Sequence, residues 1–281
     1  KEVINPADGF VEGDQVIDYT LTVRHTGVSK APGYNLEITD TLPADIAWEG
    51  DGTVSSTCPG FSFDSSADPA ISFSIGSLAL DAGPDSNGAC IIAFQGRTAV
   101  DVQPNRDLEN AVTMDYESLP NNDNGQSRTR SNSDTAGVTV NAPGITKEVV
   151  STTLAETGMG EHDPTLPDLA IGEEVTYQIT VTFPEGVTND ALIVDMLPVD
   201  GGNNTQLEAI GGSVVDIGVD GTSMPGTAMF SDASGDGVDD TVSFDFGNVT
   251  NTPDGVTDAG DRIAVQVVAR LTDIASNVDA Q

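Results

Sequence analysis

The sequence predicts an all-β protein made of two tandem antiparallel β-sandwich domains. Short stretches alternate apolar and polar residues with a period of two, which is the pattern of a strand with one buried face. The chain has 30 Gly and 15 Pro, which break these stretches, and helical periodicity is nearly absent. Three motifs of the first half also recur in the same order in the second half, about 150 positions later.

The strands of the first half follow from this alternation. The clearest is expected at residues 16–23, where Ile17, Tyr19, Leu21 and Val23 would face a core and Asp18, Thr20 and Thr22 would face away. Single turns such as Pro43-Ala44-Asp45 are the only helical candidates. Further stretches of the same kind are expected to form strands at 61–63, 91–94, 111–116 and 138–140.

The second half carries the same signal at 175–181, 242–246 and 263–267. Strands this short, separated by Gly, Asn, Asp and Pro, indicate antiparallel sandwiches and argue against a parallel α/β sheet.

The internal repeat divides the chain into two homologous domains, 1–142 and 143–281, on either side of the joint Asn141-Ala142-Pro143-Gly144. The paired motifs are Lys1-Glu2-Val3 with Lys147-Glu148-Val149, residues 13–23 with 172–181, and Ile38-Thr39-Asp40-Thr41-Leu42-Pro43 with Ile193-Val194-Asp195-Met196-Leu197-Pro198.

The two domains are not equally complete. The first has closing strands near 108–113 and 135–140, whereas the sequence of the second stops at Gln281 before any such segment. We therefore expect the second domain to lack its final strand, either because the chain is cut from a longer repeat protein or because another copy supplies the strand. An unpaired sheet edge invites such addition, so self-association into a filament or array is expected.

The charge excludes several classes of function. Lys and Arg number 10 and Asp and Glu number 45, giving a formal net charge of −35. The chain has too few cationic side chains to displace the counterions of a nucleic acid, which excludes most nucleic-acid binding. An anionic membrane surface would repel the chain. No apolar run reaches the roughly 18 residues of a transmembrane helix.

The two cysteines, Cys58 and Cys90, each lie close to an alternating stretch of the first domain. In an exported β domain they would form a disulfide that joins two strands, which indicates an extracellular location. The alternative is a pair of buried thiols in a cytosolic protein.

Several of these motifs together resemble a known family. Three motifs together with the Lys-bearing first strand are similar to the DUF11-type conserved repeat: Gly13-Asp14-x-Val16-x-x-Tyr19-x-Leu21-x-Val23, the turn His25-Thr26-Gly27, and Ile38-Thr39-Asp40-Thr41-Leu42-Pro43. That family consists of Ig-like β-sandwich modules strung in tandem in large bacterial and archaeal surface proteins, many of them catalogued as isopeptide-forming fimbrial proteins. The resemblance implies an Ig-like fold and a place at the cell surface.

The resemblance also implies a covalent cross-link. In such modules a Lys amine attacks an Asn side-chain amide beside a carboxylic acid, and an apolar core favours the neutral amine and the protonated acid. Carried over, the pattern selects Lys1, Asp40 and Asn110 in the first domain, and Lys147 and Asp195 in the second, with no matching Asn. The alternative is that each Lys pairs with surface acids, each Asp begins a Thr-Leu-Pro-type turn, and Asn110 is a turn residue.

The loop at 232–240 is a candidate calcium site. Oxygen-bearing side chains at alternate positions around a Gly suit a cation of six to eight ligands. The expected ligands are Asp232, Ser234, Asp236, the carbonyl of Val238, and Asp240, with Asp258 and Asp261 available to complete the shell. The spacing is similar to the start of an EF-hand, but Ser243 stands where a bidentate Glu belongs. The alternative is a solvated acidic hairpin connection, and weaker acidic loops lie at 81–87 and 121–124.

Catalysis has little support in the sequence. The only histidines, His25 and His162, lack a second imidazole or thiolate nearby, and no nucleophile elbow, phosphate loop or dinucleotide fingerprint occurs. The leading interpretation is a structural segment of an extracellular cell-surface fibre, stalk or matrix, stabilised by calcium and covalent cross-links, with other surface proteins as further partners. The alternative is an adhesin or a carbohydrate- or ligand-binding module, although Trp48 is expected to pack in the core or between the domains and not to bind a sugar.

Overall fold

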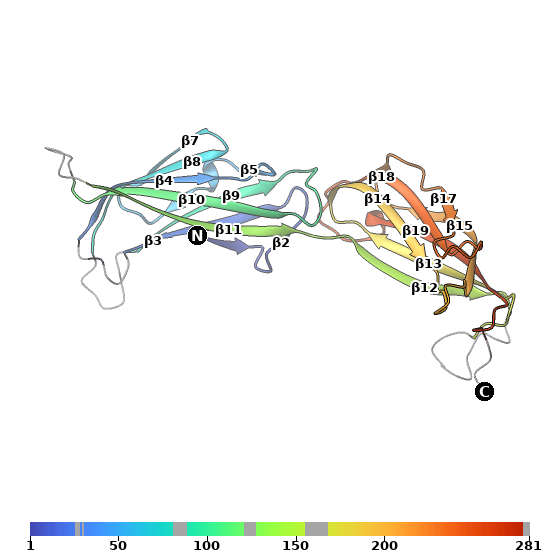
Figure 1. The fold of residues 1–281 in the computed structure, drawn as a ribbon. Coiled ribbons are helices and arrows are strands. Elements are labelled where there is room, and N and C mark those ends of the chain that lie inside the picture. The colour runs from blue at the N-terminus through green and yellow to red at the C-terminus, as the bar shows by residue number, and fades with distance from the viewer. Residues whose placement is uncertain (26–28, 30, 81–88, 121–127, 155–167, 278–281) are drawn as a thin grey trace. The chain divides into compact units, whose positions relative to one another are not determined.

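The computed structural model describes all residues except 26–28, 30, 81–88, 121–127, 155–167 and 278–281. The protein is all-β, as predicted, and its sheets stack as Ig-like sandwiches. The described residues form two compact units, Lys1–Asn141 and Ala142–Gln281, which meet at the predicted Pro/Gly joint (Figure 1). That each unit is an independent domain stays a prediction. The only helical segments in the described ranges are the single 3-10 turns η1 (Asp51–Thr53) and η4 (Ala259–Asp261).

Unit 1 is a sandwich of two sheets. The first has the order β1 (Glu2–Asn5), β3 (Val16–Val23), β9 (Cys90–Thr98) and β5 (Ile46–Trp48), with β6 (Ser55–Ser56) also on β9. The second has the order β2 (Phe10–Val11), β11 (Thr129–Val140), β10 (Asp107–Glu117), β4 (Gly33–Thr41), β8 (Ala70–Leu78) and β7 (Ser62–Ala67). Every pair of neighbours is antiparallel except β2 and β11.

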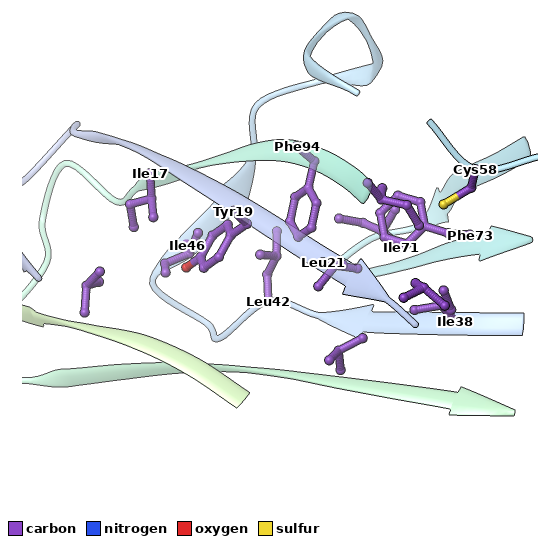
Figure 2. Close-up of a cluster of buried hydrophobic side chains, with 14 of the residues drawn as sticks. Ile17, Tyr19, Leu21, Ile38, Leu42, Ile46, Cys58, Ile71, Phe73 and Phe94 are labelled. Carbon is purple, nitrogen blue, oxygen red and sulfur yellow. The ribbon is translucent and has the colours of Figure 1, made fainter. Parts of the chain in front are cut away.

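The core of unit 1 forms where the inward faces of these sheets meet. Ile17, Tyr19, Leu21 and Val23 are buried along β3, while the residues between them are partly or fully exposed, so the predicted alternation is confirmed. Figure 2 shows Tyr19 and Phe94 side by side in this core, and their ring centroids lie 5.2 Å apart. Trp48 packs against the same cluster, with its ring centroid 5.8 Å from that of Phe94, as expected for a core residue.

Unit 2 repeats the first sheet of unit 1 and part of the second. One sheet has the order β12 (Gly144–Thr152), β13 (Glu174–Thr182), β19 (Arg262–Leu271) and β15 (Leu207–Ile217). The other has the order β14 (Gly186–Met196), β18 (Thr241–Asn251) and β16 (Gly221–Thr222), with β17 (Ala228–Ser231) also on β18. Every stretch predicted as a strand in this half lies within β13, β18 or β19.

A disulfide joins Cys58 to Cys90, and their Cα atoms lie 4.9 Å apart. The predicted bond is therefore present, and the alternative of two thiols is wrong. It links the start of β9 to the residues after β6, a segment that also pairs with β9 through the hydrogen bond from Thr57 N to Ile91 O of 2.9 Å.

Replacing both cysteines by alanine is expected to destabilise unit 1. The bond closes a loop with a sequence separation of 32, and the chain-entropy model assigns such a loop about 4 kcal/mol. Urea unfolding of the double variant, followed by tryptophan fluorescence because Trp48 lies in unit 1, measures the loss. An unchanged midpoint would show that strand pairing alone holds this segment.

Candidate functional site

Lys1, Asp40 and Asn110 come together inside unit 1. Lys1 precedes β1 in the first sheet, whereas Asp40 and Asn110 lie on the neighbouring strands β4 and β10 of the second. The Lys1 side chain is 0% exposed, and Asp40 and Asn110 are each 0% exposed as well.

The strand periodicity places the two polar residues inward. On β4 the buried positions are Gly33, Leu36, Ile38 and Asp40, and on β10 they are Leu108, Asn110 and Val112. Val112 lies opposite Asp40 in the antiparallel register, so Asn110 is the next inward residue along β10. Asp40 and Asn110 are thus strand residues, and the interpretation of either as a turn residue is wrong.

The ammonium group of Lys1 is held by one carboxylate and two aromatic rings. Lys1 Nζ lies 2.5 Å from Asp40 Oδ2, 5.2 Å from the ring centroid of Tyr19 and 5.9 Å from that of Phe94. The alternation of residues 16–23 predicts Tyr19 only as a core residue. Its position on β3, opposite Val3 of the Lys-bearing strand, brings it to the site.

Several polar atoms of this site are buried without a hydrogen bond. Among the described residues, neither side-chain atom of Asn110 has a hydrogen-bond partner, and neither does Asp40 Oδ1 or the Tyr19 hydroxyl. Burial raises the pKa of both Asp40 and Tyr19, and the Asn110 amide is close enough to oppose that rise. Leaving a buried polar group unpaired costs about 1–3 kcal/mol, so native structures seldom keep such a group.

Burial shifts both members of the ion pair toward their neutral forms. It lowers the pKa of Lys1 to about 8 from the ordinary value of 10.5, against the opposing attraction of Asp40. It raises the pKa of Asp40, although the Lys1 ammonium acts in the opposite direction. A neutral amine is a nucleophile, and a protonated carboxyl can transfer a proton. The arrangement can therefore support attack of Lys1 on the Asn110 amide.

Unit 2 contains two of the three corresponding groups. Lys147 Nζ lies 2.6 Å from Asp195 Oδ1 and 4.3 Å from the ring centroid of Tyr177. Lys147 and Asp195 lie on β12 and β14, and Asp195 is a strand residue rather than the start of a turn. The Lys147 side chain is 37% exposed, so this pair is less enclosed than its counterpart in unit 1.

The acidic loop at 232–240 is organised by its own backbone. Asp232 accepts hydrogen bonds from the amides of Gly235, Asp236 and Gly237, and Asp240 accepts from those of Ala233 and Ser234. Bonds from backbone amides lower the pKa of Asp232, with Gly237 the largest contributor.

Three of the other predicted ligands are engaged in similar contacts. Asp236 accepts from the amides of Thr205 and Val238, and Asp258 and Asp261 cap the 3-10 turn η4. No three His, Cys, Asp or Glu side chains in the described part of the chain form a group suited to a metal ion. The calcium site stays a prediction, and these contacts favour the alternative of an acidic connecting loop. The weaker candidates at 81–87 and 121–124, and His162, lie outside the described residues.

Comparisons with known proteins give only distant structural similarities. No family model and no curated protein matches it, so the DUF11-type resemblance stays a prediction. The C-terminal domain of the Streptococcus agalactiae AgI/II polypeptide BspA is 13% identical, with 94% of this chain and 86% of that one covered and a TM-score of 0.30.

Two other similar structures come from surface proteins. A C-terminal fragment of the S. agalactiae major pilin GBS80 is 11% identical, with 63% of this chain and 82% of that one covered and a TM-score of 0.35. The collagen-binding subdomain of the Enterococcus faecalis surface protein ACE is 10% identical, with 46% and 92% covered and a TM-score of 0.28. These TM-scores are too low to establish a shared fold. In the described ranges no helix is long and apolar enough to cross a membrane.

The buried Lys1 amine predicts a pH dependence in a variant that cannot form the cross-link. In Asn110→Ala, Lys1 would release its proton near its folded pKa of about 8 and in the unfolded chain near 10.5. The unfolded state binds more protons between these values, so the free energy of unfolding should rise with pH across this window.

Urea unfolding of Asn110→Ala at several pH values across that window measures this effect. The double variant Lys1→Met/Asn110→Ala is the matched control. It lacks the titrating amine, so its free energy of unfolding changes with pH only through the general rise in negative charge. Equal pH slopes in the two variants would contradict a depressed pKa at Lys1.

For the acidic loop we expect Asp232→Ala to destabilise unit 2 both with and without calcium. The substitution removes the acceptor of three backbone amides, so the unfolding temperature of unit 2 should fall. Thermal unfolding in calcium and in excess chelator measures it. A chelator-induced drop in the native chain that is absent from Asp232→Ala would instead establish the calcium site.

Proposed function

We propose that this chain is a structural segment of an extracellular cell-surface fibre or stalk, and that unit 1 is locked by an isopeptide bond between Lys1 and Asn110. The observation that supports this proposal is that the side chains of Lys1, Asp40 and Asn110 are buried together. The side-chain amide of Asn110 has no hydrogen-bond partner among the described residues.

The reaction needs no cofactor. The neutral amine of Lys1 attacks Cγ of Asn110 while the Asp40 carboxyl donates a proton to the amide oxygen. The new C–N bond forms and the amine proton passes to Asp40. Asp40 then protonates the amide nitrogen, the old C–N bond breaks and ammonia leaves, and the proton on the oxygen returns to Asp40 as the carbonyl forms again. The water-free core favours the neutral reactants, and the product carries no charge on the former Lys.

A cross-link at this position suits a mechanical role. It joins the start of β1 in one sheet to β10 in the other, so the two sheets of unit 1 cannot separate while it is intact. The disulfide adds a second covalent constraint within the first sheet. Together they would resist the unfolding and proteolysis that an exported protein meets outside the cell.

The alternative function, an adhesin or ligand-binding module, has two grooves in unit 1 to use, and the smaller one, of about 370 Å³, has Tyr116 in its lining. A groove of about 460 Å³ lies next to Lys1, between β3 and β10, and is lined by Val23, Arg24, Met114 and Asn132 among others. None of the described residues that line it is aromatic, and Trp48 packs against the core. Carbohydrate recognition through stacked rings is thus less well supported than the structural role.

Intact mass of the native chain tests the proposal. We expect a mass lower than the disulfide-bonded sequence by one ammonia, and a Lys1–Asn110 linked peptide after digestion. The loss should be absent from Asn110→Ala and from Lys1→Arg, which keeps the charge. Asp40→Ala should also lack it, because the proton transfer is lost.

The same variants should be less stable than the native chain. Closing a loop of about 110 residues is worth about 4–5 kcal/mol in the chain-entropy model, so Asn110→Ala should lower the urea midpoint of unit 1 strongly. A native chain with the full mass of the disulfide-bonded sequence would contradict the cross-link. Lys1 and Asp40 would then be a buried ion pair.

A further inference from the structure

Four apolar side chains lie exposed on the outer face of the sheet of unit 2 that contains β14, β18 and β17. Leu192, Val194 and Met196 alternate along β14 and are 56%, 46% and 76% exposed. Met229 of β17 is 52% exposed. The residues between the first three, such as Ile193, are buried. An antiparallel sheet with one face on a core usually presents polar side chains on the other, so this outer face is unusual.

The strand register makes these four residues neighbours. Val194 of β14 lies opposite Ser243 of β18, and Met229 of β17 lies opposite the same serine from the other side. Leu192 and Met196 are the next residues on the same face of β14, before and after Val194. The four therefore form one contiguous group, here named the outer apolar patch, whereas single exposed apolar residues are common on protein surfaces.

Unit 1 has a polar face at the corresponding place. The repeated motif puts Glu37, Thr39 and Thr41 of β4 where β14 has its three exposed apolar residues. Across the strands of unit 1, Thr39 lies opposite Ser72, which lies opposite Asp64. A sandwich of this kind therefore does not need apolar residues at these positions.

The patch faces outward whichever strands lie beside β14. A neighbouring strand pairs in the plane of the sheet, about 4.8 Å away, whereas these side chains stand roughly perpendicular to that plane. A layer that covers them must stack on the sheet, at about 10 Å. The surface that fits the patch is therefore one that packs against the face of the sheet.

The charge around the patch indicates the kind of partner. Residues 142–281 contain 24 of the 45 Asp and Glu but only 3 of the 10 Lys and Arg, and none of these three lies on β14, β17 or β18. Asp245 of β18 lies opposite Leu192 and is partly exposed. A second copy of this chain would bring the same negative charge to the contact, which is unfavourable, whereas a basic surface would be attracted.

We propose that the outer apolar patch of unit 2 is a docking surface for a second protein, one whose own apolar face is surrounded by Lys and Arg. Apolar contact provides the affinity, and the unbranched side chains of Met196 and Met229 adapt to the partner's surface. The basic residues of the partner face Asp245 and the other acids of unit 2. The inference gives unit 2 a binding role beyond the proposed function and does not depend on the bond between Lys1 and Asn110.

Two synthetic peptides of equal charge are the probes. One alternates Leu and Lys over about ten residues, so that an extended strand presents one apolar and one basic face. The other alternates Ser and Lys. Fluorescence anisotropy of the labelled peptides measures the Kd of each for the full chain. The native chain should bind the Leu-Lys peptide about tenfold more tightly, a ratio that needs only about 55 Å² of newly buried apolar surface.

A triple variant and a matched control locate the contact. Leu192→Glu/Val194→Thr/Met196→Thr gives β14 the polar residues of β4 and should abolish the preference for the Leu-Lys peptide. Val215→Thr/Ile217→Thr removes two exposed apolar side chains of β15, in the other sheet of unit 2, and should keep the preference. All five positions are exposed, so both variants should unfold close to the native temperature, which shows that they are folded.

The outcomes separate this inference from the proposed function. Equal affinity of the native chain for the two peptides would overturn the inference, and so would an equal loss of preference in the matched control. Native dimers that the triple variant does not form would also overturn it, because the occupant would then be a second copy. A preference that only the triple variant loses supports the docking surface, whatever the intact mass shows about the cross-link in unit 1.

Discussion

Burial of the Lys1 amine between two sheets is the constraint on which the proposed chemistry depends. A charged pair removed from water is costly, and replacing such a pair with apolar residues often leaves a protein equally or more stable. The Lys1–Asp40 pair is therefore weak support for stability by itself. Reaction with Asn110 would explain why the buried pair is present. The reaction converts the Lys1 amine into a neutral amide and removes the unpaired side-chain amide of Asn110.

The two units show what the enclosure requires. Lys1 and Lys147 hold equivalent carboxylates at 2.5 and 2.6 Å and lie near equivalent tyrosines. Their exposure differs, at 0% and 37% of the side chain, because β10 and β11 cover only the first. Burial lowers the pKa of Lys1. In unit 1 the strand β10 thus carries the Asn110 amide and also helps to exclude water from Lys1.

Much of the fold could be predicted because burial in a sandwich alternates along each strand. Ile17, Tyr19 and Leu21 followed this rule, and the repeated motifs located Asp40 and Asp195 at corresponding positions. The pairing of β10 with β4 joins distant parts of the chain, and no local pattern specifies its register. Asn110 could therefore be selected by resemblance, whereas its burial beside Asp40 required the structure.

The acidic loop shows where residue spacing is ambiguous. Asp, Ser and Gly at alternate positions suit a cation, but the same side chains also cap backbone amides in tight turns. In this loop Asp232 and Asp240 accept such bonds, which a short polar side chain makes whether or not a cation is near. The cross-link site is less ambiguous, because an amine, a carboxyl and an amide on inward strand positions have no comparable local use. Polar residues that interrupt an apolar strand face therefore carry more information about chemistry than acidic residues in a loop.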